Sequence, residues 1–364
     1  MDKTHLSAGS FEASPRARRD SDARRPPAAS FAAHRVVVDV PATCANLGPG
    51  FDCLALALRL HNRFEVTLHA EEAQGVPAPP RLEIHGSPAD VQQLGHDEDN
   101  LFLRSFHALC QAEGVTAPPM SARLHVRVPP GRGLGSSATA VVGGILAANI
   151  VLGGPLGLDE LLELAITCEP GHHPDNVAAA LLGGLVVTGA RAGDDRLASL
   201  TLPIPATLRA VLFVPDLPMS TAHSRAVLPA TYTREDATYN MSRVALLLAA
   251  LQTERSELLG TAMEDRLHQP YRQQLFPALG ALIAAGRAAG AHGVCLAGSG
   301  SAVLALVTDN GAGVRQALEA TAQRLGVAGH GLVVELARAG AQARIVQEGD
   351  GAESAPEEGA SDGE

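Results

Sequence analysis

One stretch of the sequence, residues 129–150 (PPGRGLGSSATAVVGGILAANI), restricts the fold of this chain more than any other. The alternating apolar run before it, residues 124–128 (LHVRV), predicts a strand, and the small and aliphatic residues after its glycines predict a helix. A strand, a glycine-rich turn and a helix in this order direct backbone N–H groups and the helix N-terminus toward an anion. We therefore expect a nucleotide phosphate loop in this stretch.

The kind of loop is narrowed by what the sequence lacks. A Walker A loop needs a lysine after its last glycine, but the only lysine here is Lys3. A Rossmann fingerprint needs an acid about 20 residues further on, and none follows Ile150 until Asp159. A structural turn is the alternative. The paired serines at the helix start favour a functional loop, because a hydroxyl there can cap the helix or reach a phosphate-bound magnesium ion.

The loop glycines themselves carry an expectation. They alternate with single residues (GRGLG), and such loops need the left-handed backbone that glycine adopts readily. A Cβ atom at any of them would also hold a phosphate away from the backbone amides. We therefore expect these glycines to serve the contact with phosphate.

Composition excludes several classes of protein. The chain has 364 residues, of which 46% are hydrophobic, so it can form a sizeable core in one or two domains. It has no uninterrupted apolar run of about 18 residues, which argues against a membrane span and a membrane partner. The net charge of −11 argues against nucleic acid as a partner. Five scattered cysteines without a Cys-x-x-Cys pair indicate reduced thiols and a cytoplasmic location.

The two ends of the chain differ from its middle. Residues 1–33 mix Arg, Asp, Ser, Pro and Ala without an apolar period, which predicts a disordered extension. A transit peptide is the sharper interpretation, but the acids Asp2, Glu12, Asp20 and Asp22 count against it. A mis-assigned start codon explains the extension equally well. Residues 347–364 are acidic and rich in Gly and Ala, and we expect a disordered tail.

A second informative stretch lies near the start of the fold. Residues 34–40 (HRVVVDV) predict a strand, which runs into PATCANLGPGFDC at residues 41–53. The Gly-Pro-Gly within it forces a tight turn that brings Asn46 and Asp52 to one mouth. Their chemistry suits an amino alcohol, because Asp52 can pair with an ammonium group and Asn46 with a hydroxyl. The alternative is that either residue caps a helix over residues 54–60.

These stretches together carry a resemblance. PPGRGLGSSATA resembles the second signature of the GHMP small-molecule kinase superfamily, and PATCANLGPGFDC the first signature of its homoserine kinase family. The resemblance implies a two-lobed α+β fold. Residues 34–205 would form an N-terminal lobe like the second domain of ribosomal protein S5, and residues 206–346 a ferredoxin-like C-terminal lobe. It also implies an ATP-dependent kinase that phosphorylates the hydroxyl of L-homoserine, a step toward threonine, and that could form a homodimer.

The resemblance also implies a nucleotide site. Asn100, before a helix predicted over residues 101–112, is a candidate for the adenine pocket, although alone it would be read as an N-cap. A glycine turn in GVCLAGSG (residues 293–300) resembles the third signature and would close over the phosphate loop; a simple hairpin is the alternative. The implied ATP-binding residues of the two glycine segments are Pro130, Gly131, Arg132, Gly133, Leu134, Gly135, Ser136, Ser137, Ala138, Gly298 and Gly300.

The implied metal is Mg²⁺, bound by Ser137 (or Ser136) and a glutamate. Glu169 is the first choice for this glutamate. Many family members place Glu-Gly directly before a single histidine, whereas Pro-Gly-His intervenes here, so Glu163 remains the alternative. The histidine pair at residues 172–173 does not predict a metal cluster, because adjacent histidines cannot share one face of a helix or strand.

The amino-acid substrate would lie against residues from the whole chain. In the family pattern Arg225 and Arg272 bind the carboxylate, while Asn46, Asp52 and Asn176 orient the amino and hydroxyl ends. Asp175 is expected to support these residues and not to act as a base. Two other functions remain open, namely a GHMP kinase acting on mevalonate or a sugar and an inactive ATP-binding regulator. Two carboxylate-binding arginines beside an acid argue against the first, and the serines with Glu169 argue against the second.

Overall fold

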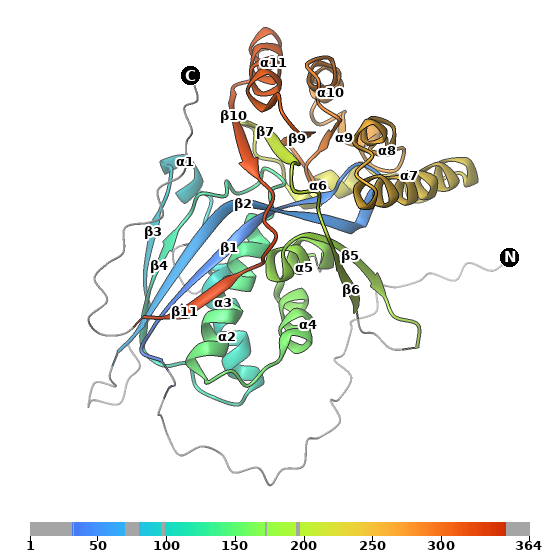
Figure 1. Cartoon of the computed structure of the whole chain (residues 1–364). Coiled ribbons are helices and arrows are strands. Elements are labelled where there is room, and N and C mark those ends of the chain that lie inside the picture. Colours follow the sequence, from blue (N-terminus) through green and yellow to red (C-terminus); the bar gives the residue numbers. More distant parts are fainter. Residues whose placement is uncertain are drawn as a thin grey trace, which may run out of the picture. The chain divides into compact units, whose positions relative to one another are not determined.

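Two long antiparallel strands, β1 (Arg35–Asn46) and β2 (Gly50–Leu68), form the centre of the first of two sheets (Figure 1). The computed structural model describes residues 31, 33–69, 80–95, 99–171, 173–193 and 197–346. The acidic tail over residues 347–364, and the extension over residues 1–33 apart from residues 31 and 33, lie outside this description. The valine-rich start of β1 is a strand, as the sequence predicts, and its Val36, Val38 and Val40 are fully buried.

The first sheet has the order β11–β1–β2–β4–β3, and β5 and β6 extend it from the other half of β2. Only β3 and β4 are parallel to each other; the other pairs are antiparallel. The remaining strands of this sheet are β3 (Arg81–His85), β4 (Met120–His125), β5 (Leu185–Ala190), β6 (Leu197–Leu202) and β11 (Gln342–Ile345).

The prediction of a helix over residues 54–60 is wrong. These residues continue β2, and both faces of the strand are buried from residue 54 to residue 58. Leu54, Leu56 and Leu58 point into a core shared with the second sheet, while Ala55 and Ala57 lie on the face that β2 packs against α5. Alternation of a large and a small apolar residue is a strand pattern with two covered faces, and the capping explanation for Asn46 and Asp52 falls with the helix.

Helices cover one face of the first sheet (Figure 1). The central one is α3, which begins at the end of the phosphate loop; Gly144 in it would place a Cβ 2.2 Å from the carbonyl oxygen of Phe102, so glycine allows α2 to pack closely. The helices of this half are α1 (Pro88–Val91), α2 (Leu101–Ala112), α3 (Ser136–Val151), α4 (Leu158–Cys168) and α5 (Pro174–Leu182).

The second sheet has the order β10–β7–β9–β8, and all its pairs are antiparallel. Along the chain its units run strand, helices, strand, strand, helix, strand, which is the ferredoxin-like arrangement predicted for the C-terminal lobe. Its strands are β7 (Arg209–Pro215), β8 (Gly293–Leu296), β9 (Val303–Val307) and β10 (Gly329–Glu335). Its helices are α6 (Thr221–Ala226), α7 (Arg234–Gln252), the 3₁₀ helix η1 (Ser256–Leu258), α8 (Leu259–Ala262), α9 (Gln269–Arg272), α10 (Leu279–Ala288) and α11 (Gly311–Arg324).

The second sheet separates two apolar cores. Ala210, Leu212 and Val214 of β7 face a core that also contains residues of β1 and β2. Val211 and Phe213, on the opposite face of the same strand, pack in a core with α10 and α11. The two sheets therefore share one continuous apolar core. This core fixes the position of one sheet against the other, and with it the residues that each contributes to the cavity described below.

The last strand joins the first sheet. β11 pairs with β1, so that Val36 lies opposite Ile345 and Asp39 opposite Gln342. The boundary expected from sequence assigned residues up to 346 to the second lobe, whereas residues 342–345 extend the sheet of the first lobe. Within the described ranges, no helix is both long and apolar enough to cross a bilayer.

Candidate active site

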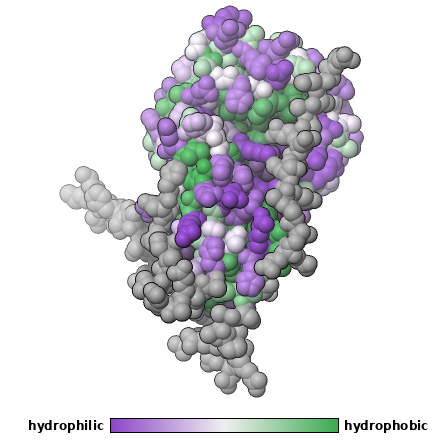
Figure 2. Space-filling view, turned by 90° about the vertical axis from the view of Figure 1, so that its left-hand side faces the viewer, coloured by the Kyte–Doolittle hydropathy of each residue, from purple (hydrophilic) through white to green (hydrophobic). Residues whose placement is uncertain are grey.

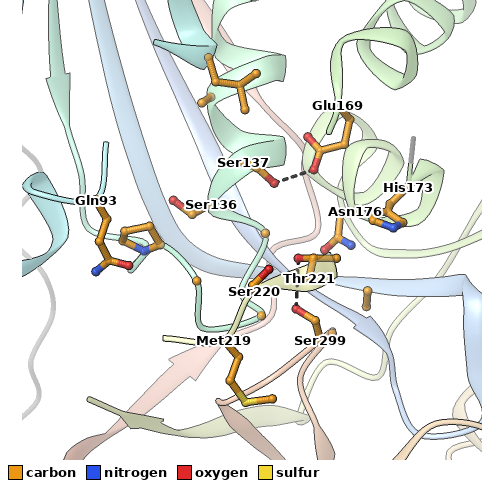
Figure 3. A pocket seen from close by; sticks show the side chains of 18 of the residues that line it. Gln93, Ser136, Ser137, Glu169, His173, Asn176, Met219, Ser220, Thr221 and Ser299 are labelled. Atoms are coloured by element: carbon orange, nitrogen blue, oxygen red, sulfur yellow. Dashed lines mark hydrogen bonds between the residues drawn. The ribbon is translucent and has the colours of Figure 1, made fainter. Parts of the chain in front are cut away.

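A cavity of about 410 Å³ is lined by the phosphate loop, the β1–β2 turn, the start of α5 and α6 (Figure 3). Both lobes contribute to it, because the phosphate loop precedes α3 of the first lobe whereas α6 and α9 belong to the second lobe. Figure 2 shows the face that lies at the left of Figure 1, with hydrophilic residues running through its middle and hydrophobic residues beside them.

The phosphate loop is attached to the protein through its carbonyl groups. The amide of Met219 donates to the Gly131 oxygen at 2.7 Å, that of Ala302 to the Arg132 oxygen at 2.9 Å, and that of Thr43 to the Leu134 oxygen at 3.0 Å. The first amides of α3 have no acceptor within their own helix. They lie at the positive end of its dipole, which suits a phosphate group.

The loop glycines have left-handed φ angles of 67°, 77° and 70°, as expected. At two of them the structure adds a further reason for glycine. A Cβ at Gly133 would lie 2.1 Å from the Ala297 oxygen, and a Cβ at Gly135 would lie 2.0 Å from Thr43 Oγ1. Glycine is therefore required at these two positions by contact with the second glycine turn and with β1.

Ser137 and Glu169 form a pair of oxygen donors beside the loop (Figure 3). Ser137 Oγ donates to Glu169 Oε1 at 2.6 Å. The other carboxylate oxygen, Oε2, is buried and has no hydrogen-bond partner within the part of the chain that the structure describes. Burial, with a smaller contribution from Asp175, raises the pKa of Glu169 to about 7. Glu163, the alternative, is exposed on α4 and does not line the cavity.

This arrangement fits a hard divalent cation. A buried carboxylate oxygen without a partner is costly, and a cation that accepts oxygen ligands would satisfy it. The described residues hold no group of three or more His, Cys, Asp or Glu side chains at metal spacing. Mg²⁺ commonly uses one or two protein carboxylates together with substrate phosphates, so the single carboxylate matches Mg²⁺ better than a metal that needs several protein ligands.

One end of the cavity is less polar. Phe64, Leu124 and Val126 line it together with Asn100. Asn100 caps α2 by accepting from the Phe102 amide at 3.0 Å, and its Nδ2 donates to the Gly95 oxygen at 2.7 Å. Its N-cap role is therefore present in the structure, alongside its place in the lining.

Sequence reasoning missed Asn62 at this end. Its Oδ1 accepts from the amides of Arg127 and Val128, each at 2.8 Å, and its Nδ2 donates to Thr139 Oγ1 at 2.8 Å. Asn62 thereby joins β2, the segment before the phosphate loop, and α3. A buried asparagine inside an otherwise apolar strand was the available signal.

The residues expected to bind ATP divide into two groups. Those that line the cavity are Asn100, Pro130, Gly131, Gly133, Gly135, Ser136, Ser137 and Gly298. Arg132, Leu134, Ala138 and Gly300 do not line it. Arg132 donates instead to the Pro215 and Pro130 oxygens at 2.9 Å each, and Leu134 belongs to the shared core. Their side chains thus support the loop from behind.

At the other end of the cavity, the β1–β2 turn meets α6. The Asp52 amide donates to Asn46 Oδ1 at 3.1 Å, so the turn does bring the two residues together. Both have left-handed backbones, with φ angles of 72° for Asn46 and 56° for Asp52. Asp52 Oδ1 accepts from Arg225 Nη2 at 2.6 Å, and Arg225 Nε donates to His173 Nε2 at 2.7 Å. An anion and a cation are therefore already paired here.

Arg272 is the buried cation of this end, with 2% of its surface exposed. Its Nη1 donates to the Gly298 oxygen at 2.8 Å and its Nε to the Ser224 oxygen at 3.3 Å. Burial, followed by the charge of Arg225, lowers the pKa of Arg272 to about 10. The guanidinium carbons of Arg225 and Arg272 lie 5.3 and 5.4 Å from the ring centre of Phe51, whose electron-rich face favours cations.

The start of α5 completes this end. Asn176 donates from its amide and its Nδ2 to Asp175 Oδ1, at 2.7 and 3.1 Å, and its Oδ1 accepts from Thr43 Oγ1 at 2.7 Å. Burial raises the pKa of Asp175 to about 6. The structure thus brings Asn46, Asp52, Asp175, Asn176, Arg225 and Arg272 to one cavity.

Several residues of this end were given no role from sequence. Thr43 and Phe51 lie within the stretch over residues 41–53, and His173 directly precedes Pro174 of α5, so position in a motif was the available signal. Thr221 and Ser299 face each other with hydroxyl oxygens 3.5 Å apart (Figure 3). Ser299 sits in the second glycine turn and Thr221 begins α6, and no sequence pattern predicts that pair.

Two family profiles match the chain, GHMP kinases N terminal domain over residues 100–184 and GHMP kinases C terminal over residues 247–324. The homoserine kinase of Trichormus variabilis is 42% identical over 292 residues, 79% of this chain and 92% of that protein. The one from Carboxydothermus hydrogenoformans is 43% identical over 292 residues, 80% and 91% of the two chains. The crystal structure of homoserine kinase from Cytophaga hutchinsonii has a TM-score of 0.75 and 29% identity, and covers 85% of this chain and 98% of that one.

Proposed function

We infer that this chain, which belongs to the homoserine kinase family of the GHMP kinases, transfers a phosphoryl group from ATP to the hydroxyl of L-homoserine. The products are ADP and O-phospho-L-homoserine. The observation that carries the inference is one cavity with a phosphate loop at one end and paired cationic and anionic side chains at the other. The family, the two-lobed fold and the kinase activity expected from sequence are confirmed.

ATP use follows from the kinase family. We propose that its phosphates bind the amides at the start of α3, where the dipole of a sixteen-residue helix favours negative charge. The adenine ring of ATP would lie at the less polar end, between Phe64 and the segment around Asn100. The Gly133 backbone in close contact with the second glycine turn keeps the loop in shape.

Mg²⁺ is proposed to bind Ser137 and Glu169. The unpartnered Oε2 of Glu169 and the hydroxyl beside it support this assignment over Glu163. When bound, the ion would neutralise negative charge on the phosphates. Without the ion, burial raises the pKa of Glu169, so the fold alone disfavours the ionised form that the cation would stabilise.

The Asp52–Arg225 pair supports an amino-acid substrate. A zwitterion can offer its ammonium group to Asp52 and its carboxylate to Arg225 and Arg272. One ion pair is then exchanged for two, and the substrate carboxylate is shared by both arginines. Mevalonate and sugars have no ammonium group and could not make this exchange.

The remaining chemistry is mainly positioning. Phosphoryl transfer needs alignment and charge stabilisation more than covalent participation of the protein. Asn46 and Asn176 are proposed to orient the substrate, and Asp175 supports Asn176 through two hydrogen bonds. The described part of the chain contains no lysine, so an aspartate–lysine pair cannot act there. Effective molarity can supply much of the rate acceleration.

Two further expectations remain proposals. All five cysteines are unpaired, which supports a cytoplasmic location where thiols stay reduced. A homodimer is proposed from the family resemblance alone, and the molar mass in solution would test it.

The test is an ADP-release assay with MgATP and L-homoserine, D-homoserine, L-threonine, mevalonate, galactose or no acceptor. We expect turnover with L-homoserine alone. Arg272→Leu should raise KM for L-homoserine roughly 100-fold, because it removes a buried charge that pairs with the carboxylate, while KM for ATP stays within about twofold.

Arg266→Leu is the matched control. Arg266 lies in the same segment but is half-exposed and pairs with Glu235 and Asp236 on the surface, so the kinetics should change less than about twofold. Turnover with mevalonate or galactose would replace the substrate but keep the enzyme class. ATP binding without turnover on any acceptor would identify a regulator.

A further inference from the structure

A buried histidine holds Arg272 from behind. His268 precedes Arg272 by four residues and is completely buried. Its Nδ1 lies 3.1 Å from Arg272 Nη1, and its Nε2 lies 2.7 Å from the backbone oxygen of Gly48. One imidazole ring thus connects the buried arginine to the turn that precedes Asp52, although Gly48 is 220 residues away in the chain.

The two contacts determine the protonation of this ring. A guanidinium group can only donate, so Nδ1 must be the acceptor. A backbone oxygen can only accept, so the proton must lie on Nε2 and be donated to Gly48. Asp265 Oδ2 is further from Nε2, at 3.6 Å. Burial, with the charge of Arg272, lowers the pKa of His268 to about 4 against the opposing effect of Asp265, which agrees with a neutral ring.

The ring is itself held in place. Asp265 Oδ2 accepts from the amides of His268 and Gln269 at 2.9 and 2.7 Å, which positions the start of α9. Asn240 donates from Nδ2 both to Asp265 Oδ1 at 2.8 Å and to the Pro49 oxygen at 3.1 Å. The segment with His268 and the β1–β2 turn are therefore joined at two independent points.

The Phe51 ring packs against both His268 and Arg272. It stacks on the His268 imidazole with centroids 5.4 Å apart and 27° between the planes. The Arg272 guanidinium carbon lies 5.4 Å from the Phe51 ring centre. The guanidinium of Arg272 is consequently bounded by His268, the Gly298 oxygen and Phe51, and few orientations remain for it.

We propose that His268 is a positioning residue for recognition of the substrate carboxylate, orienting Arg272 through Nδ1 and fixing its distance to the Asp52 turn through Gly48. This inference rests on the proposed function, because it assigns the carboxylate to Arg272. The ammonium and carboxylate of an amino acid sit on the same carbon, so their partners must keep a defined separation. His268 sets that separation, because it contacts both the arginine and the turn.

Two substitutions separate the two contacts. In His268→Gln the amide nitrogen can take the place of Nε2 and donate to Gly48, but the acceptor for Arg272 is lost. In His268→Asn the amide oxygen can take the place of Nδ1 and accept from Arg272, but the contact with Gly48 is lost. His292→Gln is the control for the same chemical change, because His292 contacts Thr308 beside the second sheet and does not line the cavity.

The decisive readout is the preference for L-homoserine over L-homoserine amide, which lacks the charged carboxylate. A hydrogen bond to a charged group corresponds to roughly 10- to 100-fold in binding. His268→Gln should raise KM for L-homoserine by that factor and reduce the preference at least about tenfold, with KM for ATP within about twofold. His268→Asn should keep the preference within about threefold of the wild-type value, and His292→Gln should leave both KM for L-homoserine and the preference unchanged.

Equal losses in both His268 variants with an unchanged preference would overturn the proposal, since that outcome means packing alone. Assays are run below each variant's unfolding midpoint. If His268→Gln does not fold, ¹⁵N NMR of the His268 ring in the wild-type protein is the test. Nδ1 should carry no proton at roughly neutral pH, and a protonated Nδ1 would refute the proposal, because it could not accept from Arg272. Absence of L-homoserine-dependent ADP release in the wild type would instead refute the proposed function.

Discussion

The two ends of the cavity are assembled in different ways. At the end proposed for the nucleotide (the nucleotide end), the phosphate loop and the start of α3 form one continuous segment, and Glu169 joins Ser137 from 32 residues further on. At the end proposed for the amino acid (the amino-acid end), Asp52 meets Arg225 across 173 residues, and Asn46 Nδ2 meets the Gly298 oxygen across 252 residues, at 3.0 Å. The first end is built from backbone in sequence order, and the second from side chains that only the folded chain brings together.

The difference has a physical consequence. Backbone amides bind through the shape of the loop, so any atom that changes this shape affects every phosphate contact at once. Charged side chains act through their separation and their burial, so each of them can be altered singly, with effects on one substrate. A single substitution at the nucleotide end should therefore abolish most of the activity, whereas a single substitution at the amino-acid end should lower it only in part.

The largest effect is expected for Gly133→Ala. Its Cβ would lie 2.1 Å from the Ala297 oxygen and 2.7 Å from the Gly300 nitrogen, both backbone atoms, at a φ of 77°. We expect activity to fall more than about 1,000-fold and the free energy of unfolding, measured with urea, to fall by at least about 3 kcal/mol.

Gly154→Ala is the control for this prediction. Gly154 has a similar φ of 75°, but a Cβ there would have no neighbouring atom within 4 Å, so only the backbone cost of about 1 kcal/mol applies. Equal losses in the two variants would mean that the left-handed backbone, and not the close contact with the second glycine turn, requires glycine at residue 133.

The next effect separates stability from activity at the same end. Glu169→Gln should lower activity roughly 100-fold, because a proposed Mg²⁺ ligand is lost. Without nucleotide at pH 8 it should raise the free energy of unfolding by about 1–3 kcal/mol, because a buried charge is removed. The pKa of Glu169 is about 7 in the fold against a usual value of 4.5. The wild-type stabilisation by this group is thus complete below pH 4.5 and lost as pH rises through 7.

The gain in Glu169→Gln should accordingly vanish at low pH, which thermal unfolding across pH measures. Glu163→Gln is the control, since Glu163 is exposed on α4 and its substitution should change stability by less than about 0.5 kcal/mol. A larger loss of activity in Glu163→Gln than in Glu169→Gln would transfer the metal assignment to Glu163.

The smallest effect is expected for Asp52→Asn at the amino-acid end. Asp52 and Arg225 are both half-exposed, so the variant should raise KM for L-homoserine only about 3- to 10-fold. KM for 4-hydroxybutanoate, which lacks the ammonium group, should not rise, because Arg225 is released for its carboxylate. Glu335→Gln, which opens an exposed ion pair with Arg59, should change neither value. A matching rise of KM for 4-hydroxybutanoate would exclude the exchange of ion pairs.

Much of the fold was predictable where the pattern is local. The helix at Leu101–Ala112 agrees with its predicted range, and the ferredoxin-like order of the second lobe follows the expected alternation of strands and helices. The failures came where burial on two sides alters a pattern. Residues 54–60 continue a strand that is covered on both faces up to residue 58, and the short β11 contains no signal that assigns it to the first sheet.

The candidate site shows the same division. The positions of Ser137 and Glu169 were predicted as a pair, but the unpartnered oxygen that distinguishes Glu169 from Glu163 is visible only in three dimensions. Arg132 was expected to bind nucleotide, and its side chain instead supports the loop through the Pro215 oxygen. The sequence gives no role to His268, because its partner Gly48 is remote in the chain.

The sequence by itself determined the phosphate loop, the family and the set of charged residues available to a substrate, because glycine spacing and motif order are properties of the chain. The tertiary structure decided which of these residues meet, how deeply each is buried, and therefore which are charged. Arg272 shows why: its place beside Phe51, and the contact of its neighbour His268 with Gly48, join segments more than 200 residues apart. Such distances are set by the packing of the two sheets on their shared core.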